Sequence, residues 1–561
     1  MDNCLYNNQV EDEFEYIIKY GYDIEGVYEK YMPSCFSLVN NTFAVFTKKI
    51  DTGSEEKIIS DALAFGYSAV PKLYVIMKED EPNRPDINAD AVKRVLDLDG
   101  RGVIIGIVDT GIDYTNPDFI TTEGNTRIIG MWDQKNNREY TKEEISDALA
   151  SDNPYNQIDF RDENGHGTYI ASVIAGNNGI ANASEIAVVK LRPARDSLRQ
   201  FWGSDVDVCY SEADIMFGIK YLLITAAEQK KPIVICIALG TNSGDHDGNT
   251  FLERYIESWA NVNGVCMVSC TGNEVGENRH CRNSNEITDD GDSWYQYEDM
   301  EISIPEERVN FATEIWSRPP GEIDVYITSP SGERYTNIAA VKNQLNQHMF
   351  LFERTTVYGY NQFADDLSGN QMIFLRWRNA SAGIWRLTVR EKSNIVRGGF
   401  DSWLSIGENS DTHPRFLNSS SDVTITSPGN TNGCITAGCY NSETESIYVR
   451  SGKGFTASGE YKPDICAPGV NISGALARNR KNQPITYTNR SGGSVAAAVT
   501  TGAAALIMQW GVVEQRRYSI STKDIKLMLT RGAARKPFIS YPSRDYGFGL
   551  IDLLNTFDVM R

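Results

Sequence analysis

The chain has 561 residues, with 54 Lys and Arg against 75 Asp and Glu, so its formal net charge is −21. A compact domain rarely exceeds about 250–300 residues, so we expect at least two folding units. The apolar share of 41% is typical of a core-forming chain and excludes a disordered one. The acidity argues against a general nucleic-acid binder, which presents a basic face, and against docking on anionic lipid.

The N-terminal residues MDNCLYNNQVEDEFEY show no basic stretch followed by an apolar one, so no secretory signal is visible and we expect synthesis in the cytoplasm. The longest uncharged stretch, 491–513, begins SGGS and is built mainly of Ala. This composition predicts a buried helix and no membrane span. The ten cysteines lie mostly in apolar runs and form no CxxC pair, which favours buried reduced thiols over a zinc or redox site.

Residues 1–77 are predicted to form a small unit of their own. Its segments indicate, in order, a strand, a helix, a hairpin, a helix and a strand: EFEYIIKYG, DIEGVYEKYMP, CFSLVNNTFAVFTKKI, EEKIISDALAFGY and AVPKLYVIM. The order β-α-β-β-α-β is that of the split βαβ, or ferredoxin-like, fold. The polar, Pro-containing segment KEDEPNRPD at 78–86 is typical of a linker.

The next segments, 78–289, change in character because their strands are continuous apolar runs. Four of these runs stand out: GVIIGIV (102–108), EIAVVKL (185–191), KPIVICIAL (231–239) and GVCMVSC (264–270). Such runs fit strands buried on both faces, and helical segments such as 211–229 separate them. The alternation predicts an α/β domain with a parallel sheet and helices on both faces.

Residues 290–415 show a different periodicity. Ile323, Val325 and Ile327 alternate with polar side chains, which indicates half-buried antiparallel strands. We therefore expect an all-β insertion, a jelly roll or sandwich. Apolar strands and helices resume over 416–561, which is interpreted as the second part of the α/β core.

Three short motifs stand at the ends of predicted core elements. Asp109 follows the strand in IVDTGID, His166 opens a helix in NGHGTYIASVIAG, and Ser494 opens a helix after two glycines in SGGSVAAAV. Taken singly, each motif fits a turn, a satisfied histidine or a loop. Together they supply the nucleophile, the base and the orienting carboxylate of acyl transfer, in the chain order known from subtilisin.

A fourth motif follows the strand at 264–270. The residues Cys-Thr-Gly-Asn-Glu place Asn273 at the end of that strand. Its amide and the backbone N–H of Ser494 can act as two donors to a developing oxyanion. Outside this constellation the Asn would be read as part of a turn.

With these motifs the chain resembles the subtilisin-like serine proteases, or subtilases, over residues 87–285 and 420–561. The segments KPDICAPG (462–469) and ALGTNSGDHDG (238–248) belong to the same resemblance. The resemblance implies that Ala238, Leu239 and Gly240 line the cleft and pair with an extended polypeptide substrate. It also implies that residues 1–77 are a prodomain that assists folding, blocks the cleft while bound, and is cut off by the enzyme itself, around Tyr74–Asp80.

The phrases KLRPA, DIMFGIKYL and IALGTN, with the insertion between Asn273 and Ser494, resemble the clostridial germination-specific subtilisin-like proteases. This resemblance implies a serine endopeptidase that is packaged in the spore and activates the zymogen of a cortex hydrolase. That group includes pseudoproteases with missing triad residues, whereas Asp109, His166 and Ser494 are all present here. Two alternatives stay open: a silent scaffold or germinant-signalling protein, and a general intracellular subtilase.

The motifs also depart from the usual subtilase pattern. Gly493 and Val495 stand where Thr and Met flank the nucleophile, and Tyr169 replaces the second His of HGTH. Gly493 bears on catalytic efficiency, because glycine loosens the backbone of the nucleophile. Asp245 and His246 in SGDHDG resemble metal ligands but are interpreted as a loop beside the cleft. No metal or cofactor is predicted, and calcium, which subtilases often bind, is left open.

Overall fold

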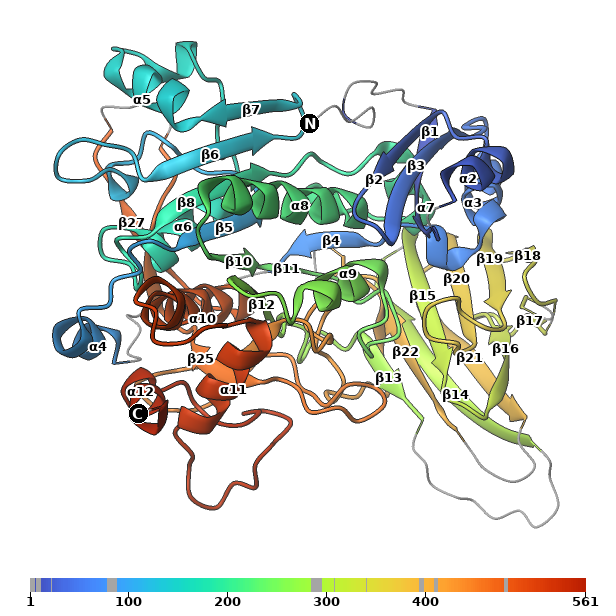
Figure 1. Ribbon diagram of the computed structural model, residues 1–561. Coiled ribbons are helices and arrows are strands. Elements are labelled where there is room, and N and C mark those ends of the chain that lie inside the picture. The colour runs from blue at the N-terminus through green and yellow to red at the C-terminus, as the bar shows by residue number, and fades with distance from the viewer. Residues whose placement is uncertain are drawn as a thin grey trace.

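The computed structural model describes residues 1–561 except 1–5, 7–11, 22, 78–87, 284–294, 307, 337, 340, 393–397, 408–411, 479–482 and 561. Figure 1 shows the N-terminal unit in blue, packed beside both an α/β core and a pair of β-sheets drawn mainly in yellow and light green. The predicted linker at 78–86 lies outside the described residues.

The N-terminal unit has a three-stranded antiparallel sheet in the order β1-β3-β2. Its elements are β1 (Glu13–Lys19), α2 (Ile24–Tyr31), β2 (Cys35–Leu38), β3 (Phe43–Lys49), α3 (Glu55–Ala62) and β4 (Leu73–Ile76). The element order is the expected one, but β4 does not complete this sheet. It pairs instead with two core strands, β9 (Cys209–Ser211) and β11 (Leu239–Gly240). Both edges of β4 are therefore satisfied by the core, and the unit is tied to it through its last strand.

The core is built on an eight-stranded sheet in the order β25-β24-β12-β10-β5-β8-β6-β7. All neighbouring pairs are parallel except β6 with β7. The strands are β5 (Ile104–Asp109), β6 (Ile128–Asp133), β7 (Arg138–Thr141), β8 (Glu185–Lys190), β10 (Ile233–Ile237), β12 (Val265–Cys270), β24 (Ile435–Tyr440) and β25 (Ile465–Pro468). The parallel α/β core predicted from the buried apolar runs is confirmed.

Helices cover both faces of this sheet. One face carries α6 (His166–Ala175) and α10 (Gly493–Met508), and the other carries α8 (Glu212–Gln229) and α9 (Phe251–Trp259). The remaining helices are α4 (Ala89–Leu96), α5 (Lys142–Ala150), α7 (Asp196–Trp202), α11 (Thr522–Gly532) and α12 (Leu553–Met560), and β26 (Ile472–Ala475) pairs with β27 (Tyr487–Arg490).

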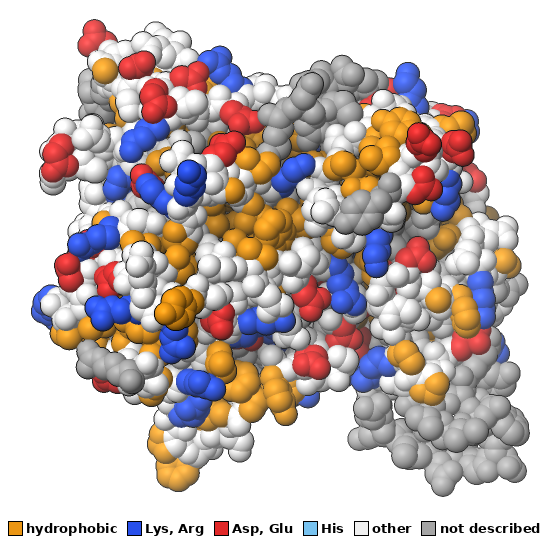
Figure 2. All heavy atoms as spheres, in the orientation of Figure 1, with side chains coloured by type: hydrophobic (Ala, Val, Ile, Leu, Met, Phe, Trp, Pro, Cys, Tyr) orange, Lys and Arg blue, Asp and Glu red, His pale blue; other side chains and the backbone are white. Residues whose placement is uncertain are grey.

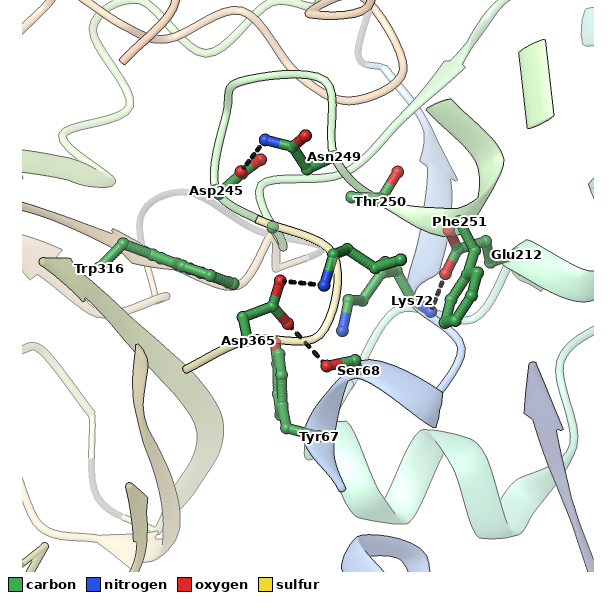
Figure 3. A pocket seen from close by; sticks show the side chains of 12 residues that line it. Tyr67, Ser68, Lys72, Glu212, Asp245, Asn249, Thr250, Phe251, Trp316 and Asp365 are labelled. Carbon is green, nitrogen blue, oxygen red and sulfur yellow. Dashed lines mark hydrogen bonds between the residues drawn. The ribbon is translucent and has the colours of Figure 1, made fainter. Parts of the chain in front are cut away.

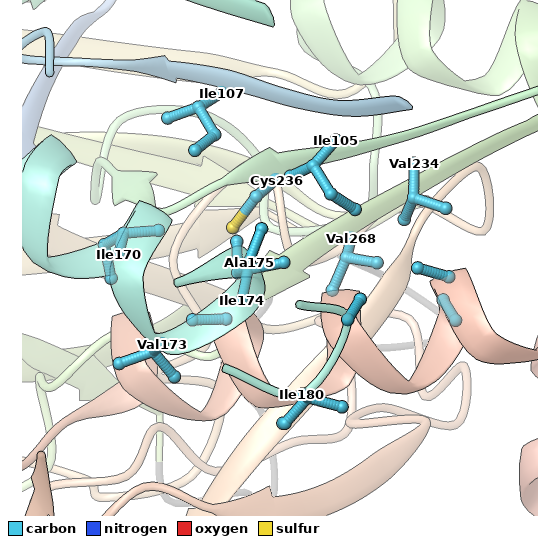
Figure 4. Close-up of a cluster of buried hydrophobic side chains, with 14 of the residues drawn as sticks. Ile105, Ile107, Ile170, Val173, Ile174, Ala175, Ile180, Val234, Cys236 and Val268 are labelled. Carbon is cyan, nitrogen blue, oxygen red and sulfur yellow. The ribbon is translucent and has the colours of Figure 1, made fainter. Parts of the chain in front are cut away.

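The face that carries α6 and α10 is a largely apolar layer. Figure 4 shows Ile170, Ile174 and Ala175 of α6 directed at strand residues that include Ile107 and Cys236. Every residue of α10 is buried, and its small alanines let it pack closely against the sheet and α6. Within the described residues, Gly493–Val513 is the one segment long and apolar enough to cross a membrane, and 89% of its apolar window is buried, as in a core helix.

The inserted region forms two facing antiparallel sheets, in the orders β13-β22-β15-β20-β19-β18 and β17-β16-β21-β14-β23, around a shared apolar core. Its strands are β13 (His280–Arg282), β14 (Tyr295–Ile304), β15 (Val309–Ser317), β16 (Glu322–Thr328), β17 (Arg334–Tyr335), β18 (Leu345–Phe350), β19 (Thr355–Gln362), β20 (Met372–Ala380), β21 (Gly383–Lys392), β22 (Phe400–Leu404) and β23 (Arg415–Phe416). Because β13 pairs with β22, this β-sandwich begins before the expected residue 290.

The described cysteines differ from the expectation at one position. Eight of the described cysteines are free and buried, which fits the interpretation as packed thiols. Cys35 of β2 is disulfide-bonded, which neither its apolar surroundings nor the absence of a CxxC pair could indicate.

Candidate active site

Asp109 and His166 form a buried pair at the end of the core sheet. Asp109 is the last residue of β5, and His166 is the first residue of α6. The imidazole Nδ1 lies 2.8 and 2.9 Å from the two carboxylate oxygens, and both side chains are at most 1% exposed. This contact fixes the imidazole with its proton on Nδ1 and leaves Nε2 as the nitrogen that can act as a base.

Asp162, which the sequence analysis did not select, holds the start of α6 in place. One carboxylate oxygen accepts the Gly165 N–H and the Thr110 hydroxyl, each at 2.7 Å, and the other accepts the N–H and hydroxyl of Thr168. Asp162 thus links the residue after Asp109 to the turn that carries His166. An acidic residue just before a helix start is a known N-terminal signal and could have identified it.

Gly167 allows the start of α6 to lie close to the loop that follows Asp109. A Cβ atom at this position would lie 2.2 Å from the carbonyl oxygen of Gly111, in the loop that follows Asp109. Any larger residue would push α6 away from that loop and separate His166 from its carboxylate. The glycine is therefore required by packing within the site.

Ser494 is the second residue of α10 and is fully buried. Its hydroxyl donates to the carbonyl oxygen of Ala238 at 3.2 Å, so the nucleophile faces the predicted cleft strand. The preceding Gly493 N–H donates to Oδ1 of Asn273 at 2.9 Å. This bond fixes Gly493, whose lack of a side chain was expected to loosen the backbone of the nucleophile. It also occupies the oxygen of the Asn273 amide. The amide NH₂ and the Ser494 N–H are then the donors that can serve an oxyanion.

Strand β4 occupies the cleft as an extended peptide would. It runs antiparallel to β11, with Ile76 opposite Leu239 and Val75 opposite Gly240. On its other side Val75 lies opposite Cys209 of β9. Continuing the antiparallel register places Met77 opposite Ala238, the residue whose carbonyl accepts the Ser494 hydroxyl. The register therefore places Met77, the last described residue before 78–87, next to Ser494.

The side chain of Met77 lies in a pocket. Of the residues that form it, the sequence predicted Gly240 but not Gly272 or Thr426. A Cβ atom on Gly240 would lie 2.5 Å from Cε of Met77 and 2.5 Å from Oγ1 of Thr426. A Cβ atom on Gly272 would lie 2.6 Å from the same Thr426 oxygen. Two glycines and one threonine thus enclose a narrow space that fits an unbranched side chain. A cavity of about 290 Å³, lined by Met77 and Asn273 among others, continues from it.

A charged seam joins the N-terminal unit, the core and the β-sandwich beside the cleft (Figure 3). At its centre Lys72, 5% exposed, places its ammonium 3.7 Å from the ring centroid of Tyr67. Burial lowers the pKa of Lys72, while the carboxylates of Glu314, Glu212, Asp365 and Asp245, in decreasing order of effect, act to raise it.

Asp365 of the β-sandwich accepts the Ser68 hydroxyl of the N-terminal unit at 2.6 Å. Glu15 of β1 forms a buried bridge from the N-terminal unit to the core, to Arg192 and to Arg195. Arg376 of β20 bonds Glu55 of α3 in a third contact. The N-terminal unit is therefore joined to both other parts by buried ion pairs and hydrogen bonds.

The Asp245–His246 motif belongs to this seam and the loop beside it. The His246 ring stacks on Trp403 at 4.0 Å, and its two nitrogens lie 2.8 and 3.0 Å from the backbone oxygens of Ile425 and Asn242. Burial, followed by the nearby Asp247, raises the pKa of Asp245 to about 8. The described part of the chain contains no group of three or more His, Cys, Asp or Glu side chains that could hold a metal ion.

An arginine fills a cluster of oxygen atoms at the C-terminal end of α6. Backbone oxygens of Ala175, Ser184 and Asp118 and the amide oxygen of Asn177 converge on the guanidinium of Arg127, which is 7% exposed. Hard cations such as calcium prefer this kind of donor set. Because the arginine already supplies the positive charge, these residues do not fit a calcium ion.

Tyr169, in place of a second histidine, takes no part in proton transfer. Its hydroxyl donates to the Ile472 carbonyl at 2.6 Å, and its ring lies under the guanidinium of Arg490. It fastens α6 to β26, so this departure from the usual motif serves packing.

Comparison with known proteins agrees with this geometry. The model of the Subtilase family, Peptidase_S8, matches residues 100–305 and 381–549. The solved structure of the CspB protease of Clostridium perfringens is 27% identical, with a TM-score of 0.74, and the match covers 85% of this chain and 99% of that one.

Among curated proteins, a PII-type proteinase of Lacticaseibacillus paracasei is 22% identical over 87% of this chain and 26% of its own length. An intracellular serine protease of Paenibacillus polymyxa is 29% identical over 24% of this chain and 32% of its own length. The chain thus spans about a quarter to a third of these two relatives. The family model covers well over half of the chain, which therefore belongs to the subtilase family of serine peptidases.

Proposed function

We propose that this protein is a serine endopeptidase whose first substrate is its own chain. The observation that carries the proposal is the register of β4, which sets Met77 opposite Ala238, whose carbonyl accepts the Ser494 hydroxyl. The bond between residues 77 and 78 is the one we assign for self-cleavage, within the expected window of Tyr74–Asp80. The specificity pocket then accepts Met or a similarly unbranched side chain.

The chemistry follows from the positions of the side chains. After its hydroxyl turns from Ala238 to His166, Ser494 Oγ attacks the carbonyl carbon of Met77 and its proton passes to Nε2 of the imidazole. Asp109 stabilises the imidazolium, and the NH₂ of Asn273 with the N–H of Ser494 stabilises the oxyanion. His166 then protonates the leaving amine of residue 78, and water hydrolyses the acyl-enzyme by the reverse roles.

After the cut, the prodomain stays in place and inhibits the enzyme. Strand β4 is hydrogen-bonded on both sides, and the buried pairs at Glu15, Glu55 and Lys72 hold the unit to the core and the β-sandwich. Removing one partner of a buried pair leaves an uncompensated charge, so dissociation is costly. A polypeptide substrate gains access when this unit is displaced.

The physiological role we propose is limited proteolysis of a zymogen in the spore, where the zymogen is that of a cortex hydrolase. Support comes from the structural similarity to CspB of C. perfringens over nearly all of that chain, and from the clostridial phrases in the sequence. An occupied cleft and a narrow specificity pocket fit selective processing better than general degradation.

Mass spectrometry of the purified full-length protein tests the self-cleavage. Wild-type protein should yield two fragments, one of them beginning at Lys78, while Ser494→Ala should remain one chain of 62.6 kDa. A co-purifying N-terminal fragment would show retention of the prodomain. If the wild type and Ser494→Ala both remain uncut, autoprocessing is refuted. If the wild type is cut at another bond, the assignment of the cleavage site from the register of β4 is wrong.

A silent scaffold or germinant-signalling protein is the second candidate, since the Ser494 hydroxyl is bonded to a backbone carbonyl in this structure. A fluorophosphonate probe distinguishes the two. Labelling of the wild type in proportion to the protein, with loss in Ser494→Ala, supports the enzyme, and an unlabelled wild type freed of its prodomain supports the scaffold. Digestion of a panel of unfolded proteins would indicate the general intracellular subtilase instead.

A further inference from the structure

The strand that occupies the cleft fills a second pocket with Tyr74, the fourth residue before the bond assigned for self-cleavage. Side chains alternate along a strand, so Tyr74 points to the face opposite from Met77. It lies opposite Tyr210 of β9 and is fully buried, in an apolar cluster that includes Leu239 and Leu252. These walls belong to the core, so they stay in place when the prodomain is displaced.

The hydroxyl of Tyr74 reaches polar groups at the end of this pocket. It lies 3.0 Å from the hydroxyl oxygen of Ser427, a hydrogen-bond distance, and Ser427 is 2% exposed. The Thr250 hydroxyl lies 3.4 Å from that of Ser427. Glu253, also buried, accepts the Thr250 N–H at 3.1 Å and lies beside both hydroxyls. Three polar side chains of the core therefore meet where the Tyr74 side chain ends.

A polar end of this kind discriminates between side chains of similar shape. A buried site built to hydrogen-bond a hydroxyl rejects an analogue without it, because its own polar groups then lose a partner. Phenylalanine would contact the same apolar walls and leave Ser427 without its bond to the substrate. The face of the protein in Figure 2 offers no comparable selection, because its acidic and basic side chains are interspersed and form no large patch of one sign.

We propose that Ser427 is a specificity-determining residue, and that the substrates of this protein carry tyrosine at the fourth position before the scissile bond. Ser427 recognises the hydroxyl, while Thr250 and Glu253 hold the Ser427 side chain in place. The substrate class is then a polypeptide with Tyr, two further residues, and Met or a similarly unbranched residue. This inference rests on the proposed function, because it counts the position of Tyr74 from the bond assigned after Met77.

A competition between two peptides tests the inference. Self-cut wild-type protein receives equal concentrations of acetylated Tyr-Val-Ile-Met-Lys-Glu and Phe-Val-Ile-Met-Lys-Glu in one tube, and mass spectrometry follows cleavage after Met. Because both peptides compete for the same enzyme, the ratio of their rates is the ratio of kcat/KM, whatever share of the clefts is open. We expect the Tyr peptide to be cut at least about tenfold faster. In Ser427→Ala the ratio should fall to about one, and in Ser446→Ala, an exposed control, it should stay at the wild-type value.

Retention of the cut N-terminal fragment gives a second measurement, which needs no added peptide. Tyr74→Phe should release the fragment at least about fivefold faster in size-exclusion chromatography, because the retained strand loses its bond to Ser427. Tyr20→Phe, which removes a buried hydroxyl elsewhere in the same unit, should release it like the wild type.

The outcomes separate this subsite from the proposed function. Equal cutting of both peptides, an unchanged ratio in Ser427→Ala, or wild-type retention by Tyr74→Phe would overturn the subsite while self-cleavage stands. A chain that is never cut after Met77 would refute the proposed function, and the subsite with it.

Discussion

Two buried regions hold the active site in place, and they differ in the side chains that form them: one is apolar and the other is charged. Beneath the triad, α6 and α10 pack on the core sheet through an apolar layer that includes Ile107 and Cys236. Beside the cleft, the seam around Lys72 buries charged groups from three parts of the chain. Apolar packing is nondirectional and insensitive to pH, whereas a buried charge is stable only with its partners in position.

This difference separates two kinds of variant. Substitutions at the triad should change the reaction rate and leave stability nearly unchanged, because the apolar layer below is untouched. Substitutions in the seam should change stability and prodomain docking. The comparison fails if a seam variant lowers the rate as strongly as a triad variant does.

The largest effect is expected for Asp109→Asn. The amide cannot hold His166 with its proton on Nδ1, so the imidazole loses the tautomer that acts as a base, and self-cleavage should slow by about 10⁴-fold. The rate is measured from the appearance of the N-terminal fragment during refolding. The thermal midpoint of Asp109→Asn should stay within a few degrees of the wild-type value. Asp147→Asn, an exposed control on α5, should keep both the wild-type rate of self-cleavage and the wild-type thermal midpoint. A rate within tenfold of the wild type would contradict the assigned role.

In the seam, Lys72→Met should destabilise the chain by about 3 kcal/mol, because it leaves the acids around it without their cation. Chemical unfolding in the uncut Ser494→Ala background measures this, with Lys57→Met as the control on the exposed face of the same unit. The loss at Lys57 should be far smaller than the loss at Lys72, because an exposed ion pair contributes little to stability. Similar losses at both lysines would show that the seam does not depend on charge.

Much of the molecule could be predicted from local patterns. The apolar run at 102–108 gave β5 within two residues, the helical segment at 211–229 became Glu212–Gln229, and the motifs around Asp109 and His166 meet as that order suggested. What could not be predicted depends on partners far apart in sequence. Glu15 and Arg192 pair although they are 177 positions apart, and β4 pairs with the core strands β11 and β9 and not with the sheet of its own unit. The periodicity of a segment gives no information on such distant partners.

Asn273→Ala should slow self-cleavage by about 10²–10³-fold, the size known for the loss of one oxyanion donor in subtilisin. It also removes the acceptor of the Gly493 N–H, so the loss tests whether that bond steadies the nucleophile. Asn273→Asp separates the two roles, because it keeps the acceptor oxygen and loses the NH₂. If Asp restores most of the rate, the residue positions Gly493 and does not serve the oxyanion. Asn156→Ala, on an exposed turn, is the neutral control.

The last expected effect is a pH dependence of stability that arises in the seam. The pKa of Asp245 is raised to about 8 in the folded chain by burial, followed by Asp247 and Glu253, against about 3.9 when unfolded. Between these values the folded state binds the extra proton, so stability falls as pH rises. We expect the free energy of unfolding of Ser494→Ala to drop by about 3–4 kcal/mol from about pH 5 to about pH 8 through this group. Asp245→Asn in that background should remove this part of the slope, and Asp147→Asn should keep it. An unchanged slope in Asp245→Asn would place the titrating group elsewhere, and the pH insensitivity assigned to the apolar layer would then be the first point to re-examine.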